Sequence, residues 1–248
     1  MDIALIVVVG VFAGFLNTVA GGGSLLTLPV LIFLGLPTAV ANGTNRVALV
    51  ASTSVAVWNF RRKGYFDWRT ALLFGIPAMI GAVLGSELAI GTPDKLFNKI
   101  LAVVMLLVLW LTIRPPKKKS NSDNESPLNM KQKIIGVIGF AFIGLYGGFI
   151  QAGVGFIIMA FMNNFAGMSL VKINSIKVLV VGLYLLISLI TYIWHGDVQW
   201  IYGLVLAVGN GIGAWLGSSF AVSKGEKWIR IVLVVSVLFM AAKLLLKF

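Results

Sequence analysis

Residues 17–46, NTVAGGGSLLTLPVLIFLGLPTAVANGTNR, form the stretch that decides how this chain folds. The stretch lies in an apolar region, yet it contains three consecutive glycines (Gly21, Gly22 and Gly23), two prolines and Arg46. Each glycine in a helix interior costs about 1 kcal/mol relative to alanine, so three in a row predict a break in the helix. At membrane depth, such a break is tolerated only where it is buried in protein or lines a water-filled cavity. The stretch therefore predicts a broken membrane segment next to a binding site.

The composition of the chain is typical of a membrane protein with many spans. Of its 248 residues, 59% are hydrophobic and only 11% are charged, and apolar runs of about 20 residues are the length of a membrane helix. In a soluble protein, the net charge of +12 could indicate nucleic-acid binding. Here the basic residues cluster between apolar runs, as the positive-inside rule describes for cytoplasmic loops. We therefore expect an all-α, multi-pass protein of the cytoplasmic (inner) membrane that contacts the lipid bilayer and binds no nucleic acid.

The apolar segments fall into two series separated by a polar linker. Segments 3–19 and 24–35 would together form a helix of about 50 Å, longer than a hydrocarbon core of about 30 Å, so we expect a sharply broken span or a re-entrant hairpin. The polar, basic residues 114–133 predict a cytoplasmic linker. The domains are thus a first membrane repeat (1–113), the linker (114–133) and a second membrane repeat (134–248). The remaining expected segments are 39–60, 69–90 and 95–113 in the first series, and 134–151, 155–166, 171–194, 198–221 and 227–246 in the second.

The second series repeats the first at a spacing of 132 residues, as from Gly85 to Gly217. The glycine break recurs as Gly153-Val154-Gly155 when the spacing shifts by one residue. Such duplication is common in secondary transporters. Other pairs at this spacing are Gly64 and Gly196, Trp68 and Trp200, Gly81 and Gly213, Ala82 and Ala214, and Ser86 and Ser218. We expect the Gly-x-x-x-Gly pairs at Gly81/Gly85 and Gly213/Gly217 to allow close helix packing.

The basic loops favour two halves of opposite orientation. The loop at 61–69 carries four Lys or Arg residues, whereas its counterpart at 193–201 carries none. The loop at 91–99 has two lysines, and its counterpart at 223–231 has three basic residues. Three full spans plus a hairpin in each half would give this inversion, and we favour it. Four full spans in each half would make the halves parallel, and Lys243 and Lys247 near the C-terminus support that alternative.

Two basic residues lie inside predicted spans and are candidates for anion binding. Arg46 is about eight residues into its span, and Lys177 is about seven residues into the matching one. A charge at the centre of a membrane helix costs about 2.5–3.5 kcal/mol and normally faces the protein interior. The alternative is that each side chain snorkels to the membrane surface, which is easier for lysine than for arginine. We expect both cations to face one cavity near the glycine breaks, with Arg46 contributing more than Lys177.

Polar and glycine residues near these cations complete the predicted substrate site. The polar side chains could donate hydrogen bonds to a ligand, although bonds between helices are nearly as good an explanation for each one. The glycines expose backbone N–H groups where a second helix begins, which favours anions. The full set of predicted site residues is Gly21, Gly22, Gly23, Ser24, Asn42, Thr44, Asn45, Arg46, Gly153, Gly155, Asn174, Ser175 and Lys177.

The positions of the acidic residues and of the one histidine argue against catalysis. All eight carboxylates lie at or near segment ends, so we expect no metal site and no carboxylate proton relay inside the membrane. His195 lies in a loop next to Asp197, so a serine hydrolase of the Ser–His type would have no base in the membrane. We expect no catalytic residues and no cofactor. An intramembrane enzyme or a scaffold without transport activity is the alternative, but neither explains a duplicated helix break.

The motifs NTVAGGGSLLTLPVL, LGLPTAVANGTNR and GDVQW…GNGIGAWLG…KGEKWIR resemble those of the TauE/SafE family of membrane transporters. The resemblance covers nearly the whole chain. It implies transport of a small sulfur-containing anion, such as sulfite, a sulfonate or sulfoacetate, by tandem repeats of membrane helices. On matching positions it implies a site at the glycine break and at Gly43-Thr44-Asn45-Arg46. The second half departs from the pattern, with Ala152 to Gly155 as a thinner glycine cluster and Asn174-Ser175-Ile176-Lys177 as the motif.

Together these features predict a secondary transporter of a small anion, and the resemblance implies that the anion contains sulfur. The sequence is compatible with a homodimer.

Overall fold

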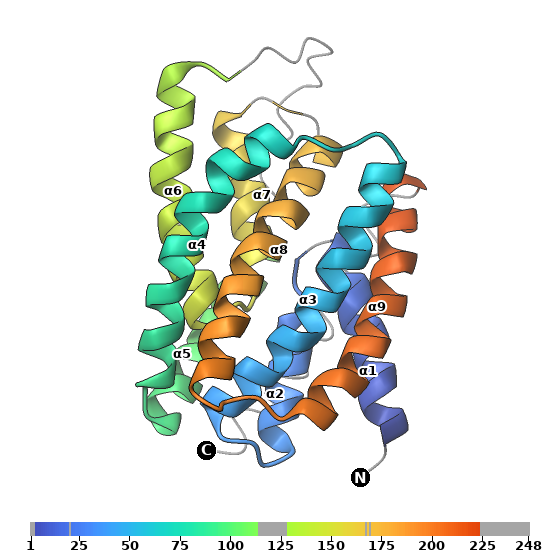
Figure 1. Cartoon of the computed structure of the whole chain (residues 1–248), viewed down its shortest axis with the longest axis vertical. Helices are drawn as coiled ribbons and strands as arrows, with labels where there is room; N and C mark the ends of the chain where they lie inside the picture. Colours follow the sequence, from blue (N-terminus) through green and yellow to red (C-terminus); the bar gives the residue numbers. More distant parts are fainter. Residues whose placement is uncertain (1–2, 20, 114–127, 167, 169, 224–248) are drawn as a thin grey trace.

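The computed structural model describes residues 3–19, 21–113, 128–166, 168 and 170–223, and all regular structure in these residues is α-helical (Figure 1). The described residues form nine helices, α1 to α9. The predicted span at 227–246 and most of the predicted linker, 114–127, lie outside the described residues. The all-helical fold class is confirmed for the part of the chain that the structure describes.

A hairpin of two short helices stands where the first broken segment was predicted. α1 (Ile3–Val19) ends before the glycines and α2 (Ser24–Phe33) begins after them. Gly21 has a φ of +79°, a left-handed conformation that glycine adopts at no steric cost. With 17 residues, α1 is about 26 Å long, less than a hydrocarbon core of about 30 Å. Figure 1 shows α1 rising from the N-terminus and α2 returning toward the same end of the molecule.

A second hairpin contains the thinner glycine cluster. α6 (Met130–Phe149) runs down from the top of Figure 1, and α7 (Val154–Phe165) returns toward the top. Gly153, the residue before α7, has a φ of +72°. α6 begins four residues earlier than the predicted span, because Asn129 and Gln132 form a reciprocal capping box at its start. The last four residues of the predicted linker are therefore helical.

Five longer helices complete the described fold: α3 (Thr38–Arg62), α4 (Trp68–Ile90), α5 (Asp94–Ile113), α8 (Leu170–Trp194) and α9 (Trp200–Ser223). By length and composition, α4, α6, α8 and α9 could each cross a membrane. α3 is 25 residues long but much less apolar, because it carries Asn42, Thr44, Asn45 and Arg46, all of which are buried. Its polar face is turned into the protein, so overall hydropathy understates how well α3 suits a membrane.

The helices pack in matching pairs. α1 packs against α9, and α6 packs against α4; likewise α3 contacts α9, and α8 contacts α4. α3 and α8 also pack against each other. In Figure 1, α1, α3 and α9 run upward, whereas α6, α8 and α4 run downward. Helices at corresponding positions of the two predicted halves therefore make corresponding contacts and run in opposite directions.

Glycines allow the two outer pairs to pack closely. A Cβ atom on Gly81 would lie 2.1 Å from the carbonyl oxygen of Ala141 in α6, and one on Gly213 would lie 2.0 Å from that of Val11 in α1. Their partners Gly85 and Gly217 face the same two helices, with a Cβ atom 2.0 Å from the carbonyl oxygen of Leu145 and 2.8 Å from that of Phe15. The predicted packing role of both Gly-x-x-x-Gly pairs is confirmed.

Candidate functional site

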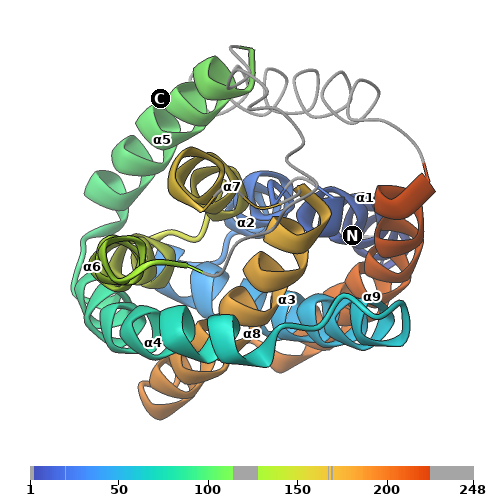
Figure 2. The same ribbon diagram turned by 90° about the horizontal axis from the view of Figure 1, so that it is seen from above.

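The two helix breaks meet at the centre of the molecule. A Cβ atom on Gly21 would lie 2.2 Å from the Cα atom of Gly155, so the two backbones are in direct contact. The Ser24 hydroxyl strengthens the junction by donating to the Gln151 carbonyl at 3.1 Å. From this junction α2 runs to one end of the molecule and α7 to the other (Figure 1), and both lie inside the outer helices in the view from above (Figure 2). Their N-termini, which carry partial positive charge, thus start from one place.

A small cavity adjoins the junction of the two breaks. It includes both glycines of the contact and has room for about one water molecule. The cationic group in its wall is the ammonium of Lys177 on α8. The residues that line the cavity are Asn17, Thr18, Gly21, Thr53, Ala56, Gln151, Gly155, Lys177, Val178 and Val181.

Lys177 is buried, and the protein supplies few hydrogen-bond acceptors for its ammonium group. Its side chain is 2% exposed, and its Nζ donates one long hydrogen bond, of 3.4 Å, to the carbonyl oxygen of Thr18. That carbonyl belongs to the last turn of α1, where carbonyl groups have no partner within the helix. An ammonium group has three protons to donate, so two of them have no partner among the described residues. Lys177 therefore does not snorkel, and its charge faces the cavity.

Arg46 is also fully buried, but its guanidinium is occupied by the end of another helix. Nη1 and Nη2 each lie 3.3 Å from the carbonyl oxygen of Gly147, and Nη2 also donates to that of Gly148. The guanidinium lies over the Tyr192 ring, 4.8 Å from its centroid, a favourable cation–π distance. Both carbonyls belong to the C-terminal turn of α6, which attracts cations.

The structure does not bring the two predicted cations to one cavity. Arg46 does not line the cavity at Lys177, because its donors are directed at the carbonyl groups of α6. It also does not reach the membrane surface, since its side chain is completely buried. The two cations instead occupy corresponding places: each contacts the last turn of the first helix of the other half.

The other predicted polar residues lie in contacts between helices. Asn42 donates to the carbonyl oxygen of Phe149 at 2.8 Å, next to the Arg46 contacts. Thr44 accepts from the backbone N–H of Gln199 at 2.8 Å. Asn45 Oδ1 accepts from the Thr27 hydroxyl at 2.6 Å. On α8, the Ser175 hydroxyl donates to the Tyr65 carbonyl, and Asn174 is buried with an unpartnered Oδ1.

The remaining predicted glycines shape the breaks. The Gly22 carbonyl accepts from Leu25 N, and the Gly23 carbonyl accepts from Leu26 N, so both close the first turn of α2. Gly23 also packs against α1, where a Cβ atom would lie 2.1 Å from the Ala13 carbonyl oxygen. Gly153 precedes α7 and does not line the cavity. Of the thirteen predicted site residues, the structure brings Gly21, Gly155 and Lys177 to the cavity.

Comparison with known proteins agrees with this arrangement of membrane helices. The sequence profile described as "Sulfite exporter TauE/SafE" matches residues 6–244. The chain belongs to the TauE/SafE family. It is a multi-pass protein of the cytoplasmic membrane, and the family is one of membrane transporters.

Relatives of this TauE/SafE protein have similar names and lengths. A "Probable membrane transporter protein" of Haemophilus influenzae is 28% identical over 98% of this chain and 94% of its own length. "Probable membrane transporter protein ORF9" of a Sinorhizobium species is 27% identical over 98% and 92%. "Probable membrane transporter protein YfcA" of Escherichia coli K12 is 30% identical over 96% and 87%. These names are consistent with a role other than catalysis. No solved structure matches the chain significantly.

Four polar side chains at the cavity of this TauE/SafE protein were missed from the sequence: Asn17, Thr18, Thr53 and Gln151. Gln151 ends the predicted span 134–151 and precedes the glycine cluster, so its position could have identified it. Asn17 and Thr18 similarly precede the first cluster. Thr53 gives no such signal, because hydroxyl groups often bond to the carbonyl of the preceding helical turn, as Thr53 does with Leu49 at 2.8 Å.

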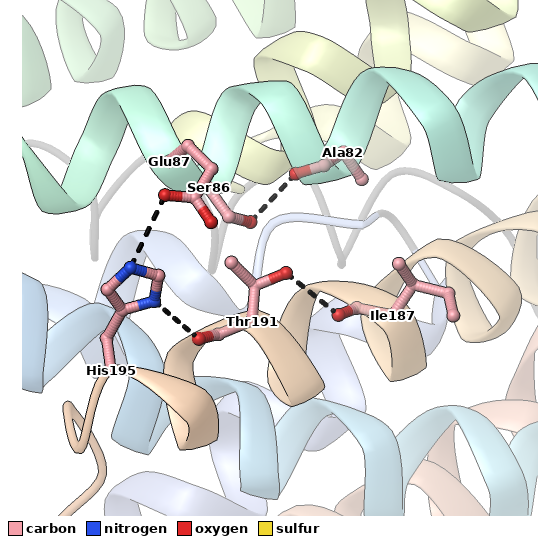
Figure 3. A network of polar contacts seen from close by, with 6 residues as sticks. All are labelled: Ala82, Ser86, Glu87, Ile187, Thr191 and His195. Atoms are coloured by element: carbon pink, nitrogen blue, oxygen red, sulfur yellow. Dashed lines mark hydrogen bonds and ion pairs between the residues drawn. The ribbon is translucent and has the colours of Figure 1, made fainter.

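A polar network joins α4 to the end of α8 (Figure 3). These ends of α4 and α8 lie at the opposite end of the TauE/SafE protein from the loop after α3 (Figure 1). His195 Nε2 lies 3.5 Å from Glu87 Oε2, and His195 Nδ1 lies 3.0 Å from the Thr191 carbonyl oxygen. Partial burial raises the pKa of the nearby Asp197 carboxyl, and the charge of His195 lowers it in part. The network is peripheral, as expected for a histidine in a loop. Within the described residues, no three His, Asp or Glu side chains are grouped as metal ligands would be.

Proposed function

We propose that this protein is a secondary transporter that carries a small anion across the cytoplasmic membrane and binds it at the Lys177 cavity. The observation that carries this proposal is the buried ammonium of Lys177, which has one long hydrogen bond and borders a cavity at the meeting of two helix breaks. An ammonium group removed from water is costly unless it is paired or hydrogen-bonded. No carboxylate lines this cavity, so a bound anion would supply the missing partner.

The helix N-termini near the cavity also favour binding of an anion. α2 and α7 begin beside the Gly21–Gly155 contact, and each presents backbone N–H groups and the positive end of its dipole there. In many secondary transporters, broken helices direct their N-terminal ends at an anionic group of the substrate. Lys177 and the two N-termini together favour an anion over a cation or a neutral solute.

We further propose that the two halves are inverted repeats and that transport proceeds by alternating access. The opposite directions of corresponding helices and their matching contacts support this arrangement. Inverted repeats are related by a pseudo-two-fold axis in the membrane plane, so each half can adopt the arrangement of the other, and the central site then opens to the opposite side. Since the cavity has room for about one water molecule, an oxyanion would require the surrounding helices to separate.

We propose a sulfur-containing oxyanion as the substrate, for example sulfite, a sulfonate or sulfoacetate. The family description names sulfite export, and the relatives are named as transporters without a substrate. Ammonium and backbone N–H groups are hydrogen-bond donors, which suits the acceptor oxygens of such an anion.

Flux into proteoliposomes tests the proposal. Wild-type protein should give saturable flux of at least one of radiolabelled sulfite, sulfate and taurine. Lys177→Ala should raise KM about tenfold or more, because a hydrogen bond to a charged group contributes about 1.5–3 kcal/mol. Lys99→Ala is the matched control, since it removes the same charge from an exposed position on α5 and should leave KM unchanged. Absence of flux for all three compounds would favour an enzyme or a scaffold, and normal flux through Lys177→Ala would place the site elsewhere.

A further inference from the structure

Gln151 has an unfavourable backbone conformation at the cavity. Its φ is +61°, and it is the only non-glycine residue with a positive φ in the described part of the chain. It follows the last residues of α6, a position at which helices commonly end with glycine or asparagine in this conformation. A side chain with a Cβ atom and a long stem is disfavoured there. Residues held in such conformations are concentrated at functional sites, so the observed outlier indicates a role for this side chain.

The carboxamide of Gln151 has a fixed orientation. The Tyr184 hydroxyl donates to Oε1 at 2.9 Å, and both side chains are buried. A buried tyrosine hydroxyl has one proton that needs an acceptor, so Oε1 is the amide atom turned toward Tyr184. Nε2 is therefore turned away from the ring, and it has no hydrogen-bond partner among the described residues. Gln151 lines the same cavity as Lys177.

We propose that Gln151 binds the transported anion together with Lys177, with Nε2 as the donor, and that Tyr184 is a positioning residue that fixes the amide. This inference rests on the proposed anion transport. It also narrows the ligand chemistry, because an ammonium group and an amide NH₂ are both donors without an acceptor. A ligand bound by both groups must accept at least two hydrogen bonds. An oxyanion such as sulfite or a sulfonate, which has several unprotonated acceptor oxygens, meets this requirement.

The strained backbone allows a test that separates binding from folding. Gln151→Gly and Gln151→Ala both remove the amide and leave the Tyr184 hydroxyl without its acceptor, but only glycine suits a positive φ, so Gln151→Gly should have a higher midpoint of thermal unfolding in detergent than Gln151→Ala. Both variants should raise the KM for the best-transported compound of sulfite, sulfate and taurine about tenfold, as expected for loss of one hydrogen bond to a charged ligand. If Gln151 had only a structural role, KM would follow the stability of the two variants and would not be raised equally in both.

Two further variants test the orientation and the charge. Tyr184→Phe keeps the Gln151 donor but frees the amide to turn, so KM should rise several-fold while the maximal flux is retained. Tyr202→Phe, on α9 and away from the cavity, is the matched control and should change neither value. Gln151→Glu replaces the donor by a carboxylate without easing the backbone, and it should abolish saturable flux by repelling the anion.

The outcomes distinguish this inference from the proposed function. If wild-type protein carries none of the three compounds, anion transport is wrong and the role of Gln151 falls with it. If wild-type flux is saturable but Gln151→Gly and Gln151→Glu keep the wild-type KM, only the role of Gln151 is wrong. A higher KM in Tyr202→Phe equal to that in Tyr184→Phe would overturn the positioning role of Tyr184.

Discussion

Two buried cations, Arg46 and Lys177, occupy corresponding places but have different surroundings. The guanidinium of Arg46 contacts two carbonyl groups and an aromatic ring, so its charge is largely satisfied by the protein. The ammonium of Lys177 has one hydrogen bond of 3.4 Å. A buried charge that makes few hydrogen bonds reduces the stability of the fold. Removal of a buried charge that makes several hydrogen bonds leaves its former partners unsatisfied. The two residues should therefore respond in opposite ways to the same substitution.

Replacing each cation by methionine tests this contrast. Arg46→Met should lower the free energy of unfolding by about 1–3 kcal/mol, because the Gly147 carbonyl loses its donors in a buried position. Lys177→Met should leave stability unchanged or raise it, since an apolar side chain replaces a weakly bonded charge. Thermal unfolding in detergent measures both effects. Equal destabilisation by the two substitutions would contradict the assignment of Arg46 to the fold and of Lys177 to the ligand.

The sequence identifies both cations but not their contacts. Charges inside apolar segments stand out in any reading of the chain, so Arg46 and Lys177 could be selected without a structure. The expectation that Arg46 contributes more rested on the greater freedom of a lysine side chain to snorkel to the membrane surface. Its actual partners depend on where α6 ends and on which helix lies opposite that end, and both are properties of the packed fold. Gln151 was missed because its left-handed backbone is set by the break and not by its residue type.

At the scale of helices, glycine decides where the two hairpins turn and how closely they meet. The glycine clusters predicted both breaks correctly, because three glycines, or a Gly-x-Gly with a neighbouring alanine, weaken a helix at a defined point. The contact between Gly21 and Gly155 could not be predicted, since it joins residues from different halves. It requires that Gly21 carry no side chain, because a Cβ atom there would lie 2.2 Å from the Cα atom of Gly155. Boundaries were predicted to within a few residues, and α6 differs through its capping box.

Substitution of Gly21 or of Gly35 by alanine distinguishes the cost of a packing clash from the cost of backbone strain. Both glycines have positive φ, +79° and +89°, but a Cβ atom on Gly35 would meet nothing within 4 Å. Gly35→Ala should therefore cost only about 1 kcal/mol, the typical penalty for a side chain in this conformation. Gly21→Ala adds a clash with the Gly155 backbone, and overpacking of this kind costs about 1–3 kcal/mol more. Thermal unfolding and the yield of folded protein measure the difference, and equal effects would show that the two breaks can separate without cost.

For the whole molecule, the arrangement of basic residues predicts which end faces the cytoplasm. The basic end of α3, with Arg61 and Arg62 in its last turn, lies at the top of Figure 1 together with the start of α6. The start of α1, the α2–α3 connection and the α8–α9 connection lie at the other end. The positive-inside rule assigns the top to the cytoplasm. A chain without native cysteine is well suited to testing this assignment.

Single cysteines at four described positions test both the orientation and the first hairpin. Ile3→Cys and Gly35→Cys should react with a membrane-impermeant maleimide added to intact cells, because α1 and α2 leave the membrane on the side where α1 entered. Lys63→Cys and Asn129→Cys should react only after the cells are opened, because the basic ends of α3 and α6 face the cytoplasm. A straight helix through residues 3–33 would place Ile3 and Gly35 on opposite sides, so only one of them would be labelled. That result would refute the hairpin. Labelling of Lys63→Cys and Asn129→Cys from outside, with Ile3→Cys and Gly35→Cys protected, would keep the hairpin but reverse the orientation.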